Sequence, residues 1–313
     1  MSTLASIRSR GRGGVAKDGT VDGIPVARKD IGRRPIIAYT FLTLMALLWL
    51  VPVLWTFYAS LRSYQDTAVN GYFSIARSLT LDNYFNAYSQ SDFSKYLLNS
   101  AIITIPAVIM TLFLASMVAF VVSRYSFKLN VTLLLIFTAG NLLPPQIILV
   151  PLYRLYLVLP LPEFLNTKGI WYDSYWGVVM IHIAFQMGFA TFVLSNFMKA
   201  LPKDISEAAT IDGASVWQQY WRVILPLCRT PLAALAVLLT TWIYNDFLWA
   251  LVLMSTGDKR PITAALNNLK GQFFTDYNLL AAGSMLAAIP TMLIFFILQR
   301  QFVAGLTLGA TKG

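Results

Sequence analysis

Long apolar runs separated by short polar segments dominate the pattern of this chain. An α-helix needs roughly 20 apolar residues to cross about 30 Å of hydrocarbon at about 1.5 Å per residue. Six runs reach that length: Ile36–Ser60, Leu97–Val122, Val131–Tyr153, Trp176–Met198, Pro231–Met254 and Leu279–Leu298. The pattern therefore predicts an all-α integral membrane protein with six transmembrane helices.

Composition agrees with this class. Of the 313 residues, 57% are apolar and 12% are charged, whereas soluble domains are about 45–50% apolar and about 25% charged. The segment before the first run is polar and rich in glycine and arginine, so we expect a disordered tail. The run that follows is too long for a cleaved secretory signal, so the first span should stay in the mature protein.

The positive charges predict an orientation. The net charge is +10, and eight basic residues precede the first run: Arg8, Arg10, Arg12, Lys17, Arg28, Lys29, Arg33 and Arg34. Because Lys and Arg accumulate on the cytoplasmic side, we expect the N-terminus inside the cell. Six spans then return the C-terminus to the cytoplasm. A basic tail beside a membrane span gives no reason to expect a nucleic-acid partner.

A short helical hairpin is predicted between the fourth and fifth runs, on the cytoplasmic side of this topology. Asp204 is a favoured N-cap and Glu207 follows three residues later, as in a capping box. Ala208 and Ala209 are small enough to let another backbone come close. Gly213 can adopt the positive φ of a sharp corner. Glu207 would place one negative charge at the rim of the small-residue face.

The second arm of this hairpin is predicted to be amphipathic. Ser215 can cap a helix over Val216–Ile224, which Pro226 and Pro231 would end. The side chains expected on the spans or in the membrane interface are Val216, Trp217, Tyr220, Val223 and Ile224, and those expected to face water are Gln218, Gln219 and Arg222. Such a helix either lies on lipid headgroups or fits a socket on another protein, and its few basic residues favour the socket.

The extended pattern of this segment resembles a known family. The string LPKDISEAATIDGASVWQQYWRVILPLCRTPL resembles the EAA loop of inner-membrane permease subunits of ABC importers, in particular the carbohydrate-uptake branch typified by the maltose permease G component. Support elsewhere comes from NLLPPQIILVPLY, YNDFLWALVL and the terminal QRQFVAGLTLGATKG. The resemblance thus runs along most of the chain.

This resemblance implies a type I ABC importer permease-like bundle in the bacterial inner membrane. The predicted organisation is a basic, disordered cytoplasmic tail over 1–35, a six-helix permease domain over 36–302 with its coupling loop at about 199–230, and a cytoplasmic tail over 303–313. Residues implied to couple to an ATPase subunit are Glu207, Ala208, Ala209, Asp212, Gly213 and Pro226. The implied partners are a second permease, two ATPase subunits carrying ATP and Mg, an external solute-binding protein, a sugar and membrane lipid.

The chain itself shows no catalytic motif. A phosphate-binding G-x-x-x-x-G-K-[ST] loop is absent from the sequence, so we expect no ATPase site of its own. The lone Cys228 is interpreted as a packing residue, and no metal site is expected because no His/Cys cluster occurs. His182 falls inside the fourth run. A functional role and a neutral imidazole bonded to a neighbouring helix both remain open, and the second is favoured.

A few polar residues within the runs are candidates for the translocation path or a gate. Asp246 is the acidic residue well inside a run, beside Tyr244 and Asn245, and a carboxylate at that depth should face the bundle or water. Asn141 and Gln146 flank Pro144-Pro145, which must break the helix there. For both sets, a lining role and a purely structural role remain open.

Two other classes of protein fit a polytopic chain. A secondary transporter should show inverted internal repeats with paired broken helices, and no convincing repeat is found. A membrane scaffold that transports nothing is the other alternative. Neither class accounts for the extended motif before the fifth of six runs.

Overall fold

The computed structural model describes residues 20–21, 24–25, 34–90, 92–140, 144–270 and 275–307. The chain divides into two compact units, Met1–Trp55 and Thr56–Gly313. The first holds the antiparallel pair β1 (Thr20–Val21) and β2 (Ile24–Pro25) and most of α1 (Arg34–Ser60). The rest of the predicted tail over 1–35 lies almost entirely outside the described residues.

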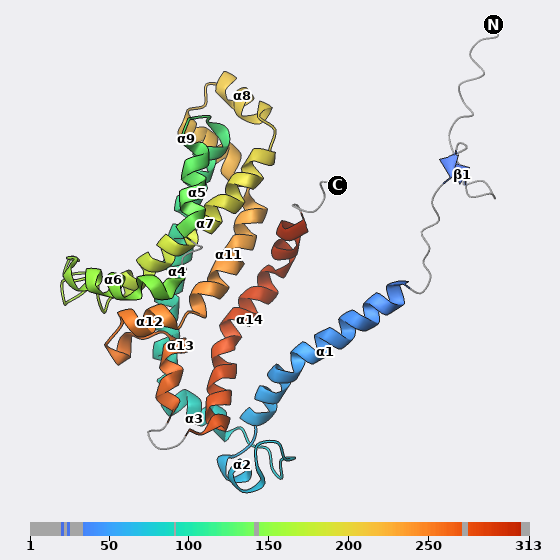
Figure 1. Ribbon diagram of the computed structural model, residues 1–313, viewed down its shortest axis with the longest axis vertical. Helices are drawn as coiled ribbons and strands as arrows, with labels where there is room; N and C mark the ends of the chain where they lie inside the picture. Colours follow the sequence, from blue (N-terminus) through green and yellow to red (C-terminus); the bar gives the residue numbers. More distant parts are fainter. Residues whose placement is uncertain are drawn as a thin grey trace. The chain divides into compact units, whose positions relative to one another are not determined.

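Four long helices form the centre of the second unit (Figure 1). They are α4 (Phe93–Arg124), α7 (Tyr175–Ala200), α11 (Arg229–Tyr244) and α14 (Tyr277–Thr307). Helix α4 packs along α7, and α11 packs between α4 and α14. Alanines at positions 107, 115, 119 and 190 are fully buried where α4 meets α7. Such small side chains let two membrane helices approach closely.

Four of the six predicted spans are continuous apolar helices: Ile36–Ser60, Phe93–Arg124, Tyr175–Ala200 and Tyr277–Gln299. Two bent helix pairs also pass by length and composition, residues 132–158 and residues 216–244, so up to six spans result if each pair counts as one. The second pair joins the second arm of the predicted hairpin to α11, so it does not coincide with the predicted fifth run. The third span consists of α5 (Asn130–Gly140) and α6 (Pro145–Val158), whose axes differ by 90°. The predicted break at the Pro144-Pro145 pair is confirmed, since α6 begins at Pro145 and proline cannot donate a backbone bond.

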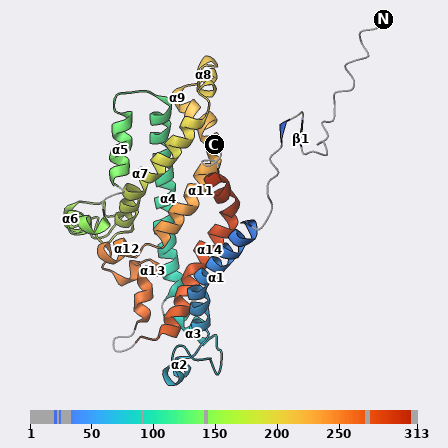
Figure 2. The same cartoon turned by 45° about the vertical axis from the view of Figure 1, so that its right-hand side comes forward.

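Helix α5 packs mainly on α7, although α4 precedes it in the sequence (Figure 2). The connection between α4 and α5, residues 125–129, is short, as the sequence predicts. Short connections usually join neighbouring helices. Here the surface of α7 offers the contact instead, so the position of the second and third runs as neighbours along the chain does not reveal which helix α5 packs against.

The fifth span is shorter than predicted. Helix α11 ends at Tyr244 instead of continuing to Met254, and α12 (Leu248–Leu253) follows after a break. The polar residues Asn245 and Asp246, which lie between these two helices, explain why α11 ends at Tyr244. The Asn245 side chain donates to Thr241 O (2.8 Å), and the Asp246 carboxylate accepts from Trp249 N (3.2 Å). Asn and Asp side chains compete in this way with the helical backbone pattern.

Short helices and loops cover the end of the second unit that lies opposite α8 (Figure 1). These are α2 (Tyr64–Asn70), α3 (Asp82–Gln90), the 3-10 turns η2 (Gly257–Lys259) and η3 (Leu266–Leu269), and α13 (Ile262–Ala265). Arg62 is 1% exposed there; it forms an ion pair with Asp66 (2.8 Å) and donates to the carbonyls of Tyr72 and Ser74. A buried guanidinium with these partners fixes the loop after α1.

Candidate functional site

The hairpin (Asp204–Leu227) lies at one end of the second unit, between α7 and α11 (Figure 1). Its first arm is α8 (Asp204–Ile211). Lys203 has helical angles (φ −67°, ψ −30°), so Asp204 is already inside the helix and no side chain caps it. The predicted capping box between Asp204 and Glu207 is therefore wrong. Both carboxylates still lie in the first turn, where the helix dipole favours negative charge.

The corner of the hairpin depends on Gly213. Its φ is +79°, and a Cβ added there would meet no atom within 4 Å. The backbone conformation, and not crowding, therefore demands glycine. Ala214 N donates to Ala209 O (2.9 Å) and Gly213 N to Thr210 O (3.0 Å), which is the bond pattern of a Schellman cap. The predicted corner at Gly213 is confirmed.

The second arm begins as predicted but does not end as predicted. Ser215 and Gln218 form a capping box at the start of α9 (Val216–Gln218). The chain stays helical through the π-helical η1 (Gln219–Ile224) and α10 (Leu225–Leu227). Pro226 lies inside α10 and Pro231 inside α11, and a 75° bend separates Val216–Leu227 from Arg229–Tyr244. The expected end at Ile224 is wrong because a widened π register precedes Pro226.

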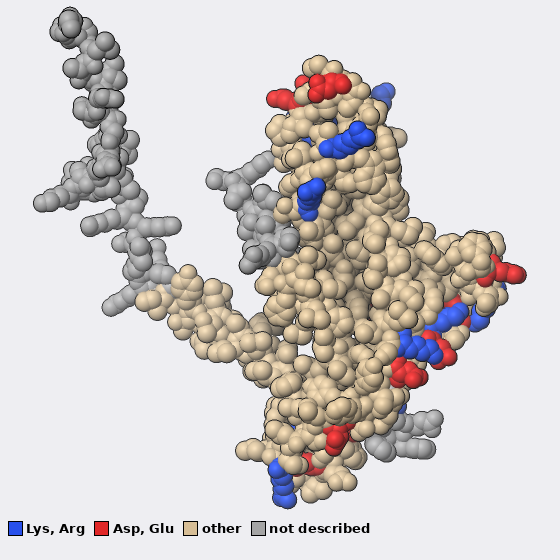
Figure 3. Space-filling model, turned by 180° about the vertical axis from the view of Figure 1, so that it is seen from behind, with Lys and Arg blue, Asp and Glu red and all other residues tan. Residues whose placement is uncertain are grey.

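One face of α8 is open. Asp204, Glu207, Ala208 and Ile211 are exposed and recur at helical spacing, whereas Ala209 is 8% exposed and faces the second arm. The two alanines therefore do not share a face, which corrects the sequence interpretation. Space-filling atoms show acidic side chains gathered at this end of the molecule (Figure 3). The exposed acids there are Asp204, Glu207 and Asp212.

Sequence reasoning missed the structural importance of two residues. Ile211 is 86% exposed at the end of α8, an unusual position for a large apolar side chain. Its spacing of four residues from Glu207 could have placed it on the open face. Gln219, expected to face water, is 6% exposed and donates to Thr210 Oγ1 and Ala214 O (3.1 Å each). That expectation is wrong because Gln219 joins the two arms, a contact that helical periodicity does not reveal.

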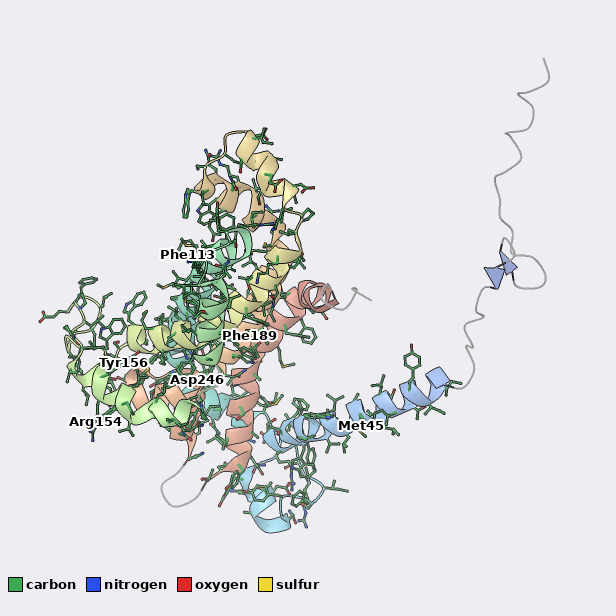
Figure 4. The ribbon with its side chains drawn as sticks, turned by 45° about the horizontal axis from the view of Figure 1, so that its top comes forward. Met45, Phe113, Arg154, Tyr156, Phe189 and Asp246 are labelled. Atoms are coloured by element: carbon green, nitrogen blue, oxygen red, sulfur yellow. The ribbon has the colours of Figure 1, made fainter. Side chains whose placement is uncertain are left out.

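The polar residues of the broken fifth span form a second group. Tyr244 is 6% exposed and donates to Ala287 O (2.9 Å), while Asn245 is exposed. The Asp246 carboxylate, 16% exposed, lies 3.8 Å from Nε2 of His182, which is 4% exposed. Figure 4 labels Asp246 within the bundle. Residues 64 positions apart in the sequence thus meet at the break between α11 and α12.

Among the described residues, no candidate for the translocation path from outside the broken fifth span lies beside Asp246 and His182. Asn141 lies outside the described residues, and Gln146 is exposed in the first turn of α6. A cavity of about 10 Å³ lies beside Asp246 and His182 and is also lined by Ser100, Thr104 and Tyr244. That volume holds about one water molecule. It is far too small for a sugar in this conformation.

The fold and the hairpin define a class: a polytopic helical membrane protein that presents a short, cornered helix pair at one end. The chain belongs to the family described as binding-protein-dependent transport system inner membrane component, which it matches over residues 19–307. It is thus a multi-pass permease subunit of the inner membrane, and the resemblance seen in the sequence is confirmed. Free Cys228 is buried, in line with its predicted packing role.

Individual relatives support this assignment. A probable ABC transporter permease protein of Pyrococcus horikoshii is 31% identical over 88% of this chain and 96% of its own length. The arabinooligosaccharides transport system permease protein AraQ of Halalkalibacterium halodurans is 30% identical over 88% of this chain and 95% of its own. A solved bacterial ABC transporter involved in import of the acidic polysaccharide alginate contains a chain with a TM-score of 0.70 and 19% identity. That match covers 86% of this chain and 96% of the other and shows a shared fold.

Proposed function

We propose that this chain is a membrane subunit of an ATP-driven importer that takes up oligosaccharides. A relative covering nearly its whole length is named for arabinooligosaccharide transport, and the solved structure with the same fold comes from an alginate importer. The substrate class rests on these names. The mechanism rests on the hairpin.

The open face of α8 is the observation that carries the mechanism. It exposes Glu207, Ala208 and Ile211 on a helix whose C-terminal end is fixed by the Gly213 corner and the Gln219 bonds. An isoleucine that is 86% exposed, beside a carboxylate and a small residue, suits a partner with an apolar cleft and a basic rim. We assign that cleft to a cytoplasmic ATPase subunit.

The chain then acts as a two-state switch and makes or breaks no covalent bond. Two ATPase subunits bind ATP and Mg, and their closure moves the docked hairpins of this chain and of a second, related permease. An external solute-binding protein delivers the sugar at the opposite end. Differential binding of the closed ATPase pair to one state shifts the population of spans between inward and outward access. Both termini and the hairpin face the cytoplasm in this arrangement.

For the path residues, the contacts favour a structural role at Asp246. Its carboxylate accepts from Trp249 N and lies beside His182, and its backbone oxygen accepts from Thr263 Oγ1 (2.6 Å). These partners hold the break between α11 and α12 in place. Asn245, which is exposed beside it, is the better candidate for contact with a passing sugar.

Retention of the ATPase subunits tests the docking site. The full complex is expressed with its partner subunits, captured through this chain, and assayed for co-purified ATPase. Ile211→Asp should reduce the retained ATPase at least tenfold, because a charge would be buried against an apolar cleft. Ile75→Asp is the matched control, since Ile75 is 90% exposed on a loop at the other end.

Equal retention in the Ile211→Asp complex and the wild-type complex would reject docking through α8. The same loss with Ile75→Asp would indicate general misassembly and would also remove support for the site. A reproducible absence of any ATPase from the wild-type complex would reject the importer itself.

A further inference from the structure

The hairpin is joined to α4 by a buried hydrogen bond between residues 104 positions apart. Tyr220 OH lies 2.8 Å from Ser116 Oγ, and the two residues are 2% and 1% exposed. Ser116 Oγ also contacts Phe113 O (2.8 Å), and a carbonyl can only accept. Ser116 therefore donates to Phe113, and the Tyr220 hydroxyl donates to Ser116. The direction of this bond is fixed by its surroundings.

Aromatic rings surround this bond on both sides. Tyr220 packs on Phe120 of α4 with ring centroids 5.5 Å apart, and Trp221 stacks on Phe113 at 6.0 Å. Figure 4 labels Phe113 close to the hairpin. Trp217 contacts both Tyr220 and Trp221 at 5.6 Å. Such pairs are directional contacts that resist sliding, so η1 and this stretch of α4 should move together.

The hairpin itself is braced as one body. Gln219, next to Tyr220, bonds Thr210 of α8 and the carbonyl of Ala214, and Thr210 Oγ1 in turn donates to Ser206 O (2.9 Å). A displacement of α8 is therefore carried to η1. The covalent route onward from η1 to α11 is less direct, because the helix bends by 75° at Cys228.

The far end of α4 holds the opposite loops in a similar way. Asn99 donates to the carbonyls of Asp258 (2.8 Å) and Arg260 (3.0 Å). Ser100 Oγ accepts from Ile262 N (2.8 Å). One continuous 32-residue helix thus connects the hairpin to the segment 258–262. Asn99 and Ser116 lie 17 residues apart on this helix, about 25 Å along its axis, with Pro106 between them. An axial displacement at Ser116 would be carried to Asn99 along this helix.

We infer that Tyr220 is a positioning residue, which through Ser116 makes α4 the lever that carries hairpin motion to the segment 258–262. This rests on the proposed function, since it needs a hairpin moved by an ATPase. The inference adds a route to that function: the displacement of the hairpin reaches the segment 258–262 through α4, and not through α11, which follows the hairpin directly in the sequence.

The test uses the complete complex in lipid nanodiscs, with a fluorophore on a Gly257→Cys variant. Gly257 is exposed in η2, and an added Cβ there meets no atom within 4 Å, while the native Cys228 is fully buried. ATP with orthovanadate traps the ATPases closed, so no sugar is needed. The fluorescence change on trapping reports whether segment 258–262 follows the hairpin.

Tyr220→Phe and Ser116→Ala should each cut this fluorescence change at least twofold while ATPase retention stays at the wild-type level. The double variant should show no further loss of the fluorescence change, because each single change removes the same hydrogen bond between Tyr220 and Ser116. Tyr125→Phe is the matched control: its ring also contacts Phe120, at 6.0 Å, and it should keep the full response. Ser116→Ala keeps the test decisive if Tyr220→Phe misfolds.

A full response in both single variants would overturn the α4 lever while leaving the proposed function intact. Additive losses in the double variant, or an equal loss with Tyr125→Phe, would also overturn it. A wild-type complex that retains its ATPase but shows no change on trapping would overturn the α4 lever and leave the proposed function intact. A wild-type complex that retains no ATPase would reject the proposed function.

Discussion

Asp173 offers a sharp test of how the loops opposite the hairpin are held. It is fully buried just before α7, with Oδ1 accepting from Thr256 N (2.9 Å) and Oδ2 accepting from Thr256 Oγ1 and Lys168 Nζ. Its backbone N donates to Leu253 O (2.9 Å), and its backbone O accepts from Lys259 Nζ (2.9 Å). Asp173→Asn would keep the shape and remove the charge.

The magnitude follows from the pKa of this carboxyl. Burial alone would raise the pKa, but the Lys168 ammonium and the Thr256 bonds outweigh it and lower the pKa from 3.8 to about 2. A shift of that size corresponds to about 2 kcal/mol. Because Lys168 is 46% exposed and its charge is screened, we expect Asp173→Asn to cost about 1–2 kcal/mol at pH 7. Asparagine tolerates the positive φ of 59° at this position.

The pH dependence has a defined sign. A carboxyl whose folded pKa is depressed stabilises the fold above its unfolded pKa of about 3.9, and this contribution is lost as pH falls toward 2. Thermal unfolding in detergent at pH 7 should show the Asp173→Asn chain a few degrees below wild type. The gap should shrink steadily between pH 4 and pH 2.5.

Glu163→Gln is the control, because Glu163 is exposed in the same loop and should unfold like wild type at every pH. An Asp173→Asn chain as stable as wild type at pH 7 would refute the reasoning. So would a gap that stays constant down to pH 2.5.

Two further predictions concern packing and orientation. A Cβ on Gly177 would collide with the backbone oxygen of Trp171, so Gly177→Ala should destabilise the chain by about 1–3 kcal/mol in thermal unfolding. Gly140→Ala, which meets no atom within 4 Å, should be nearly neutral. Asp212→Cys should react with a membrane-impermeant maleimide in inverted vesicles and not in intact cells, because the hairpin is expected to face the cytoplasm. The native Cys228 is fully buried and should not react. Labelling in intact cells would place the hairpin outside.

Much of the fold could be read from local sequence. The apolar runs set the spans because the length of hydrocarbon to be crossed is fixed. Pro144-Pro145 marked the break before α6, because a missing N–H acts on its own neighbours. Gly213 marked the corner because it tolerates a positive φ, and Ser215 marked the second cap because its hydroxyl accepts a nearby backbone N–H; both effects are local. The extended motif of the hairpin also indicated the family, which the comparisons confirm.

Only the tertiary structure decided which side chains of the hairpin are buried and which partners they bond, because those partners lie in other segments of the chain. Ala208 and Ala209 are neighbours of equal size, yet only Ala209 is buried, because the second arm folds back over it. Gln219 looks like a surface residue until Thr210 and Ala214 supply its partners.

The same holds across the bundle. Asp246 meets His182, and Tyr220 meets Ser116, only because α7 and α4 pack where they do. Periodicity and capping rules describe interactions over a few residues, so the sequence by itself determined most of the spans and the corner, and the extended motif indicated the class of protein. Which polar side chains pair, and therefore how the hairpin is joined to the bundle, was decided by long-range packing that no local pattern encodes.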